Sequence, residues 1–183
     1  MLREDGRTAL IVTHDPLDVL ALADRVIVVD GGRIVEDGTV PRVLTRPRSA
    51  FGARIAGTNL LGGTVEADGL ATEVGVVHGL ADDDCTPGAV AAAVFPPSAV
   101  AVYTEPPHGS PRNALRVTVG ELEARGATVL VRASGGLSAE ITTAAAADLT
   151  LEPGTRVWFC GQGHRGPDPQ GGMISADCRS GSA

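Results

Sequence analysis

Short apolar runs bounded by turn residues dominate the first 57 positions of the chain. Thr8–Thr13 is apolar and β-branched, a pattern typical of a buried parallel strand. Asp15 is then suited to cap a helix whose first position is Pro16, where the missing N–H removes no helical hydrogen bond. Apolar residues at helical spacing continue to Ala23. The pattern therefore predicts a strand followed by a helix.

A hairpin and two short helices follow in the same part of the chain. Arg25–Asp30 is a second apolar run, and Gly31-Gly32 predicts a tight turn into Arg33–Glu36. The next predicted elements are two short helices, Val40–Leu44 and Ser49–Ala56. Residues 1–57 thus have an α/β pattern.

The pattern changes to β after this point. Residues 58–88 form a transitional segment with short β-like runs, and residues 89–160 alternate strands with turns. The predicted strands of the second range are Val90–Phe95, Ala99–Tyr103, Leu115–Leu122, Thr128–Ala133, Leu137–Thr142 and Thr155–Cys160. Several short strands at this spacing indicate a small β-barrel. Residues 161–183 are rich in glycine and poor in apolar side chains, so we expect disorder there.

Composition excludes several classes of function. The net charge of −7 argues against nucleic acid as a partner. All 15 basic residues are arginine, so the chain has no lysine for a standard phosphate-binding P-loop. No run provides the roughly 20 apolar residues of a membrane span, and no apolar signal-peptide region follows the N-terminal charges. Three scattered cysteines are typical of unpaired thiols in a reducing cytosol, and we expect no metal site.

The first constellation of interest is the strand, His14-Asp15, helix and hairpin of the N-terminal part. Considered alone, a histidine at the end of a strand is either a solvated residue or part of an α/β ligand site. Thr8–Asp15, Ala21–Arg25 and Val28–Gly38 together closely resemble the end of the nucleotide-binding domain of ABC ATPases. This resemblance covers roughly residues 7–57. It implies that His14 is the switch histidine, the catalytic residue that contacts the γ-phosphate.

The other motifs of that family are absent from these 183 residues. They are the P-loop, the Q-loop, the signature sequence, the Walker B carboxylates and the D-loop. Phosphoryl transfer needs the γ-phosphate and Mg²⁺ positioned together. We therefore expect no ATP hydrolysis by this chain alone, and ATP and Mg²⁺ as cofactors only of an intact parent protein.

The second constellation is Ser110-Pro111-Arg112-Asn113, which opens a predicted strand. Its residue types suit either a simple turn or a cradle of donors for a tetrahedral oxyanion. Together with the later strands, it resembles the Mop domain, the molybdate-binding version of the TOBE domain, over about residues 108–160. That resemblance implies an OB-like barrel, molybdate as the ligand, and Ser110, Arg112 and Asn113 as the oxyanion-binding residues, acting between two copies of the fold in a homodimer.

The chain departs from the Mop pattern after Cys160. The family continues with a lysine that helps to hold the anion, and this chain has Gln162 at that position. A set of codons can encode Gly161–Gly166 and, when the reading frame is shifted by one base, encode Val-Lys-Ala-Thr-Glu-Val. This second sequence is the continuation that the family resemblance leads us to expect. We hypothesise that the tail is translated out of frame. The anion site then lacks a cation and the final strand loses its outer half, so we predict weak or no molybdate binding and a less stable barrel.

The predicted fold is thus an α/β remnant of an ABC ATPase domain followed by an all-β, OB-like TOBE/Mop barrel. We expect the chain to be part of the ATP-binding subunit of a molybdate importer. The partners implied are a transmembrane permease subunit and a second ATPase copy, at the cytoplasmic face of the membrane. Two alternatives remain: a free-standing cytosolic molybdate-binding protein, and a non-functional product of a disrupted gene.

Overall fold

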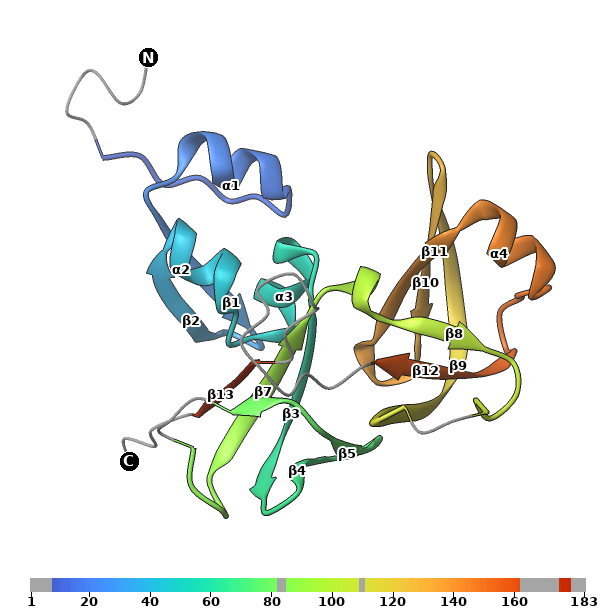
Figure 1. Ribbon diagram of the computed structural model, residues 1–183. Coiled ribbons are helices and arrows are strands. Elements are labelled where there is room, and N and C mark those ends of the chain that lie inside the picture. The colour runs from blue at the N-terminus through green and yellow to red at the C-terminus, as the bar shows by residue number, and fades with distance from the viewer. Residues whose placement is uncertain (1–7, 82–84, 109–110, 162–174, 179–183) are drawn as a thin grey trace.

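The computed structural model describes residues 8–81, 85–108, 111–161 and 175–178 (Figure 1). An α/β part stands at the N-terminal end, and two β-sheets follow it (Figure 1). This arrangement confirms the predicted order of an α/β part and a barrel-like β part. No helix of the described residues has the length and apolar character needed to cross a membrane.

Local side-chain caps set the starts of two of the three N-terminal helices. Helix α1 (Pro16–Leu22) begins after Asp15, whose Oδ1 accepts a hydrogen bond from the N–H of Leu17 at 2.8 Å. Helix α3 (Ala50–Ala56) begins after Ser49, whose Oγ accepts from the N–H of Gly52 at 2.9 Å. Helix α2 (Val40–Thr45) lies between them in the chain. All three predicted helices are confirmed.

Strands β1 (Arg25–Asp30) and β2 (Arg33–Thr39) form the predicted hairpin. Gly31 and Gly32 both have positive φ, +54° and +75°, as a tight hairpin turn requires. Glu36 ties this hairpin to the start of α3. Its two carboxylate oxygens accept hydrogen bonds from the N–H of Arg48 and the hydroxyl of Ser49, each at 2.8 Å.

The predicted strand at Thr8–Thr13 is wrong for this structure. These residues have no regular structure, and the side chains of Leu10 and Val12 are 90% and 95% exposed. A strand is stable only beside a neighbour that completes its backbone hydrogen bonds. Among the described residues, no strand lies beside this segment.

The β part consists of two sheets. The first has the order β5-β4-β3-β7-β13-β6 and the second has the order β11-β10-β9-β12-β8. The strands of the first sheet are β3 (Asn59–Glu66), β4 (Gly69–Thr72), β5 (Gly75–Val77), β6 (Leu80–Ala81), β7 (Val90–Phe95) and β13 (Ser175–Cys178). The strands of the second are β8 (Ala101–Tyr103), β9 (Asn113–Arg125), β10 (Thr128–Ala133), β11 (Ser138–Thr142) and β12 (Arg156–Gly161). Short helices complete the chain: η1 (Pro97–Ala99), η2 (Ser134–Gly136) and α4 (Thr143–Asp148).

The two sheets are two copies of one arrangement. In the first copy β3 pairs with β7 and β4, and in the second β9 pairs with β12 and β10, all antiparallel. The registers agree as well, because Asn59 lies opposite Phe95 and Asn113 lies opposite Gly161. The predicted transitional segment, residues 58–88, therefore supplies the first strands of a complete copy.

The copies exchange their last strands. Strand β8 follows β7 in the chain but pairs with β12 of the second copy, with Val102 opposite Phe159. Strand β13 follows β12 but pairs with β7 of the first copy, with Ala176 opposite Ala93. Each sheet is thus completed by a strand from the other half of the chain.

One hydrophobic core spans both copies. It contains residues of the first copy such as Leu61 and Phe95, and residues of the second such as Val117, Val131 and Val157. The last two are fully buried. Because the core and the exchanged strands are shared, the two copies form one folding unit.

The expectation of disorder after residue 160 differs from the structure at two places. Gly161 ends β12, and residues 175–178 form β13. The physical reason is the outer edge of β7, whose backbone groups need hydrogen-bonding partners and find them in β13. The remainder of the tail, including Gln162, lies outside the described residues.

Candidate functional site

His14 lies between residues 8–13, which have no regular structure, and helix α1. Its neighbours fix the local backbone: Thr13 Oγ1 accepts a hydrogen bond from the N–H of Asp15 at 3.0 Å, and its hydroxyl donates to Asp18 at 2.8 Å. The His14 side chain is exposed. The backbone is therefore held by local bonds while the imidazole faces solvent.

The predicted oxyanion residues lie at the start of β9, in a different part of the molecule (Figure 1). Ser110 lies outside the described residues. Arg112 is exposed directly before the strand, and Asn113 is 3% exposed at its first position. The structure therefore separates the predicted catalytic histidine from the predicted anion cradle.

Asn113 joins the two copies through its side-chain amide. Its Oδ1 accepts a hydrogen bond from the backbone N–H of His78 at 2.6 Å, and its Nδ2 donates to the backbone C=O of His78 at 2.8 Å. His78 follows β5 of the first copy. We call this pair of bonds an asparagine clasp.

Asn59 makes the equivalent clasp in the opposite direction. Its Oδ1 accepts from the N–H of Ser138 at 2.7 Å, and its Nδ2 donates to the C=O of Ser138 at 2.9 Å. Asn59 is 1% exposed and Ser138 is 9% exposed, so this clasp is buried. Each copy therefore holds the other through the first residue of its long strand.

The end of β12 lies beside the predicted cradle. Gly161 pairs with Asn113 in the β9–β12 ladder. A Cβ added at Gly161 would lie 4.0 Å from the Cβ of Asn113, its nearest side-chain atom. Gly161, the residue before Gln162 in the sequence, thus lies next to Asn113. This is the point where the resemblance expects a lysine and the sequence has glutamine.

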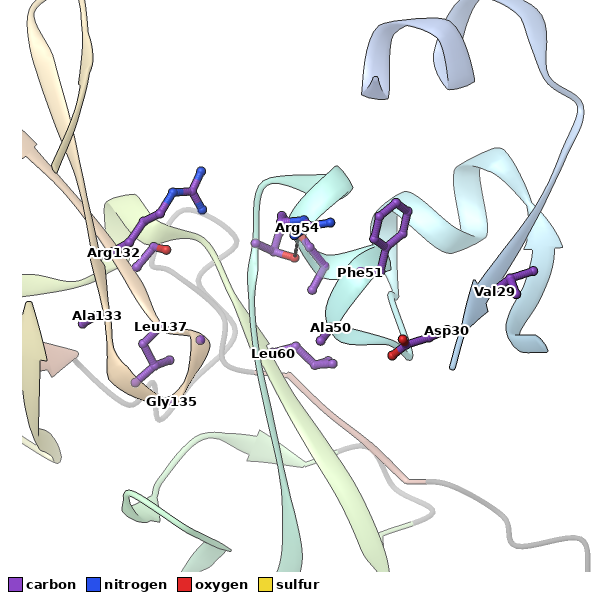
Figure 2. A pocket seen from close by; sticks show the side chains of 14 residues that line it. Val29, Asp30, Ala50, Phe51, Arg54, Leu60, Arg132, Ala133, Gly135 and Leu137 are labelled. Atoms are coloured by element: carbon purple, nitrogen blue, oxygen red, sulfur yellow. Dashed lines mark hydrogen bonds between the residues drawn. The ribbon is translucent and has the colours of Figure 1, made fainter. Parts of the chain in front are cut away.

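A cavity of about 530 Å³ lies at the Asn59 clasp, between α3, β3 and the β10–η2 turn (Figure 2). Its lining residues are Val29, Asp30, Ala50, Phe51, Ala53, Arg54, Thr58, Leu60, Arg132, Ala133, Gly135, Gly136, Leu137 and Ser138. Arg54 lies over the Phe51 ring, 4.9 Å from its centroid. The lining carries two guanidinium groups and the carboxylate of Asp30 (Figure 2).

Arg132 is already paired with carboxylates. Its Nη2 donates to Glu123 at 2.8 Å, and its Nε lies 3.9 Å from Glu121. Arg125 also donates to Glu123, at 3.0 Å. The hydrogen bonds from Arg125 and Arg132 hold the pKa of the Glu123 carboxyl below its ordinary value. Since Arg132 is paired and Asp30 is present, this cavity is a poor site for a dianion.

The repeat gives the two clasps different neighbours. Arg112 precedes Asn113, whereas Thr58 precedes Asn59. Three positions before each asparagine, the second copy has Ser110 and the first has Ala56. Only the second copy therefore has the serine and arginine of the predicted cradle.

Sequence reasoning missed Asn59 and the repeat. Two signals point to them. Each copy opens with Asn-x-Leu, at Asn59 and Asn113, and each has Pro-Gly shortly before the strand that pairs with its first strand, β7 or β12. The two glycines, Gly88 and Gly154, share positive φ values of +86° and +92°. These shared residues are an internal repeat, which self-similarity along the sequence reveals.

Comparisons with known proteins agree with this architecture. Residues 109–160 match the TOBE domain family. The chain is 52% identical over 167 residues to the molybdenum import ATP-binding protein ModC of Mycobacterium tuberculosis, strain H37Rv, covering 87% of this chain and 45% of the relative. It is 35% identical over 133 residues to the Fe(3+) ions import ATP-binding protein FbpC of Streptomyces avermitilis, covering 61% of this chain and 39% of the relative.

Among solved structures, the molybdate-bound form of the cytoplasmic molybdate-binding protein ModG aligns with a TM-score of 0.46 and 23% identity. That alignment covers 57% of this chain and 89% of the other. The chain spans less than half the length of the two curated relatives above.

Proposed function

This chain is a relative of the ATP-binding subunits of molybdate importers and corresponds to their C-terminal part, and from this premise we propose that it supplies the oxyanion-sensing portion of such a subunit. The supporting observation is the 52% identity over 87% of the chain. The match extends well beyond the TOBE region at 109–160. A free-standing molybdate-binding protein has no use for the α/β part, which favours the importer.

The oxyanion is bound at the start of β9. Arg112 supplies the positive charge, because its guanidinium is exposed and no ion pair is found for it among the described residues. Ser110 supplies a hydroxyl donor. Asn113 has a positioning role, because its two hydrogen bonds to His78 fix where the first copy lies against the cradle.

One chain then binds one molybdate. The cradle at Asn113 has its arginine and serine, while the counterpart at Asn59 has Thr58 and Ala56. Arg132 at that counterpart is shared with Glu123 and Glu121. A dianion at the counterpart site meets little net positive charge, so it gains little there.

The ATPase part acts only within a complete nucleotide site. His14 contacts the γ-phosphate once other residues hold ATP and Mg²⁺. The chain has no lysine of its own for a P-loop. The partners in that complete state are a transmembrane permease and a second ATP-binding subunit, at the cytoplasmic side of the membrane.

Calorimetric titration with molybdate tests the anion site. We expect weak binding at one site per chain, lost in Arg112→Gln and kept in Arg132→Gln, the matched control. Gln162→Lys restores the expected cation, and we expect binding about tenfold tighter or more, the worth of one charge-assisted hydrogen bond. Equal losses in the two arginine variants, or two equivalent sites, contradict the assignment.

A further inference from the structure

The cavity beside the Asn59 clasp has two chemically different sides. Its volume of about 530 Å³ falls within the range of about 300–1,000 Å³ that small-molecule sites occupy. In the view of Figure 2 the guanidinium groups of Arg54 and Arg132 lie on one side of the cavity, and the side chains of Leu60 and Leu137 lie on the opposite side. The cavity is therefore cationic on one side and apolar on the other.

The apolar side is built from side chains that packing holds in place. Leu137 is 1% exposed and Ala53 is 2% exposed, and Leu60 is half-buried. The N–H of Ser138, another lining residue, is already bonded to the side chain of Asn59 and is not available as a donor. This side therefore favours a ligand that removes apolar surface from water.

Arg54 supplies the cation. Its guanidinium lies over the ring of Phe51, 4.9 Å from the centroid, and both residues belong to α3. This cation–π contact does not require the N–H donors, which point outward in the plane of the guanidinium. No carboxylate within the described part of the chain forms an ion pair with Arg54. Its planar set of donors is thus free to bind a carboxylate through two hydrogen bonds.

The remaining charges limit the ligand to one negative charge. Arg132 is shared with Glu123 and Glu121, so it adds little net positive charge. The carboxylate of Asp30 also lines the cavity and repels a second anionic group. A monoanion bound at Arg54 therefore gains more free energy here than a dianion does.

We propose that this cavity binds a small carboxylic acid with an apolar body, as its monoanion. The carboxylate pairs with Arg54, and the apolar body lies against Leu60 and Leu137. This site is separate from the oxyanion cradle, which lies at the other clasp, beside Asn113. The bound acid contacts α3 of the α/β part and the β10–η2 turn of the second copy, so it links the two parts of the molecule.

Titration of the ¹⁵N-labelled 183-residue chain with octanoate, followed by NMR, tests the proposal. We expect saturable shifts of the amides of Leu60, Gly135 and Gly136, with a Kd of about 1 mM or tighter. Hexanoate should bind about tenfold more weakly, because it buries two fewer methylene groups. A Kd that does not depend on chain length overturns the apolar side of the assignment.

Two matched compounds separate the role of the charge. The alcohol 1-octanol has no carboxylate, and suberate carries a second carboxylate at the end that should meet the leucines. We expect each to bind at least about tenfold more weakly than octanoate, since the alcohol loses a charge-assisted interaction and suberate places a charge against apolar side chains. Equal binding of octanoate and either compound refutes the proposal.

Substitutions locate the site. Arg54→Gln changes an exposed side chain, so the variant keeps its fold, and we expect it to weaken octanoate binding at least about tenfold. Arg156→Gln is the matched control, because Arg156 is also exposed but lies in β12 and does not line the cavity. An equal loss in the control overturns the proposal. So do octanoate-induced shifts at Arg112 and Asn113 in place of the cavity, or displacement of octanoate by molybdate, because both place the acid in the oxyanion cradle.

Discussion

Removing the Asn59 clasp is expected to destabilise the whole β part. The Asn59→Ala variant deletes two hydrogen bonds, at 2.7 and 2.9 Å, between the first copy and the backbone of Ser138. Because both residues are buried, water does not readily replace the amide. The N–H and C=O of Ser138 are then left without these partners inside the protein.

The expected loss follows from those two groups. A buried polar group left unsatisfied costs about 1–3 kcal/mol, so two groups cost about 2–6 kcal/mol. Domains of this size are stable by about 5–15 kcal/mol, so the variant loses a large share of its stability. Asn113→Ala should cost less, about 1–2 kcal/mol, because its partner His78 is only partly buried and water reaches the exposed groups.

Urea unfolding followed by Trp158 fluorescence measures both losses, since Trp158 is the single tryptophan and lies in β12. Asn59→Leu, which has the same branched shape and removes the same bonds, separates lost hydrogen bonds from a lost side chain. A loss below about 0.5 kcal/mol in Asn59→Ala, or a larger loss in Asn113→Ala, refutes the reasoning about burial.

Three other outcomes check the remaining features. Deleting residues 162–183 removes β13, so hydrogen exchange should speed up at residues 91–94 of β7 and stay unchanged in β12; the opposite pattern contradicts the strand exchange. Gly52→Ala should destabilise by about 1–3 kcal/mol in urea unfolding, because an added Cβ collides with Glu36 Oε2; Gly62→Ala, where nothing lies within 4 Å, is the control, and equal effects exclude this cause. Arg125 and Arg132 lower the pKa of Glu123, so its contribution to stability is complete above the ordinary carboxyl pKa of 4.5 and is lost as the pH falls through the lowered folded-state value. In an NMR titration, Arg132→Gln should raise that pKa toward 4.5, and an unchanged value excludes the pairing.

Elements set by local chemistry were predictable from the sequence. Asp15 and Ser49 cap their helices through side chains only a few residues away from the bonded N–H. Gly31 and Gly32 form the hairpin turn because both positions need positive φ. These features depend on short stretches of chain, so their residue types are sufficient to predict them.

Elements set by distant partners were not predictable in the same way. The run Thr8–Thr13 has the composition of a strand, but composition cannot supply the neighbouring strand that it needs. Conversely, the glycine-rich tail was expected to be disordered, yet residues 175–178 pair with β7 across a long separation in sequence. Pairing across such distances follows from the topology and not from local propensity.

The candidate site also contains residues that were predictable from local motifs and residues that depend on distant partners. His14 and the Ser110–Asn113 segment were singled out from short motifs. The clasp that occupies the Asn113 amide was not foreseen, because it depends on His78, which lies in the other copy. Asn59 lacks a neighbouring arginine and therefore offered no motif of its own.

The strand exchange also sets an order of events during synthesis. Strand β7 leaves the ribosome early, but the strand that covers its outer edge, β13, is among the last residues made. At typical elongation rates the edge at Ala91–Val94 waits roughly 4 to 16 s for its cover. An uncovered edge of alanine and valine invites pairing with other nascent chains during this interval. The N-terminal half of the chain is therefore finished by its C-terminal end, and any event that stops translation early leaves the half already made incomplete.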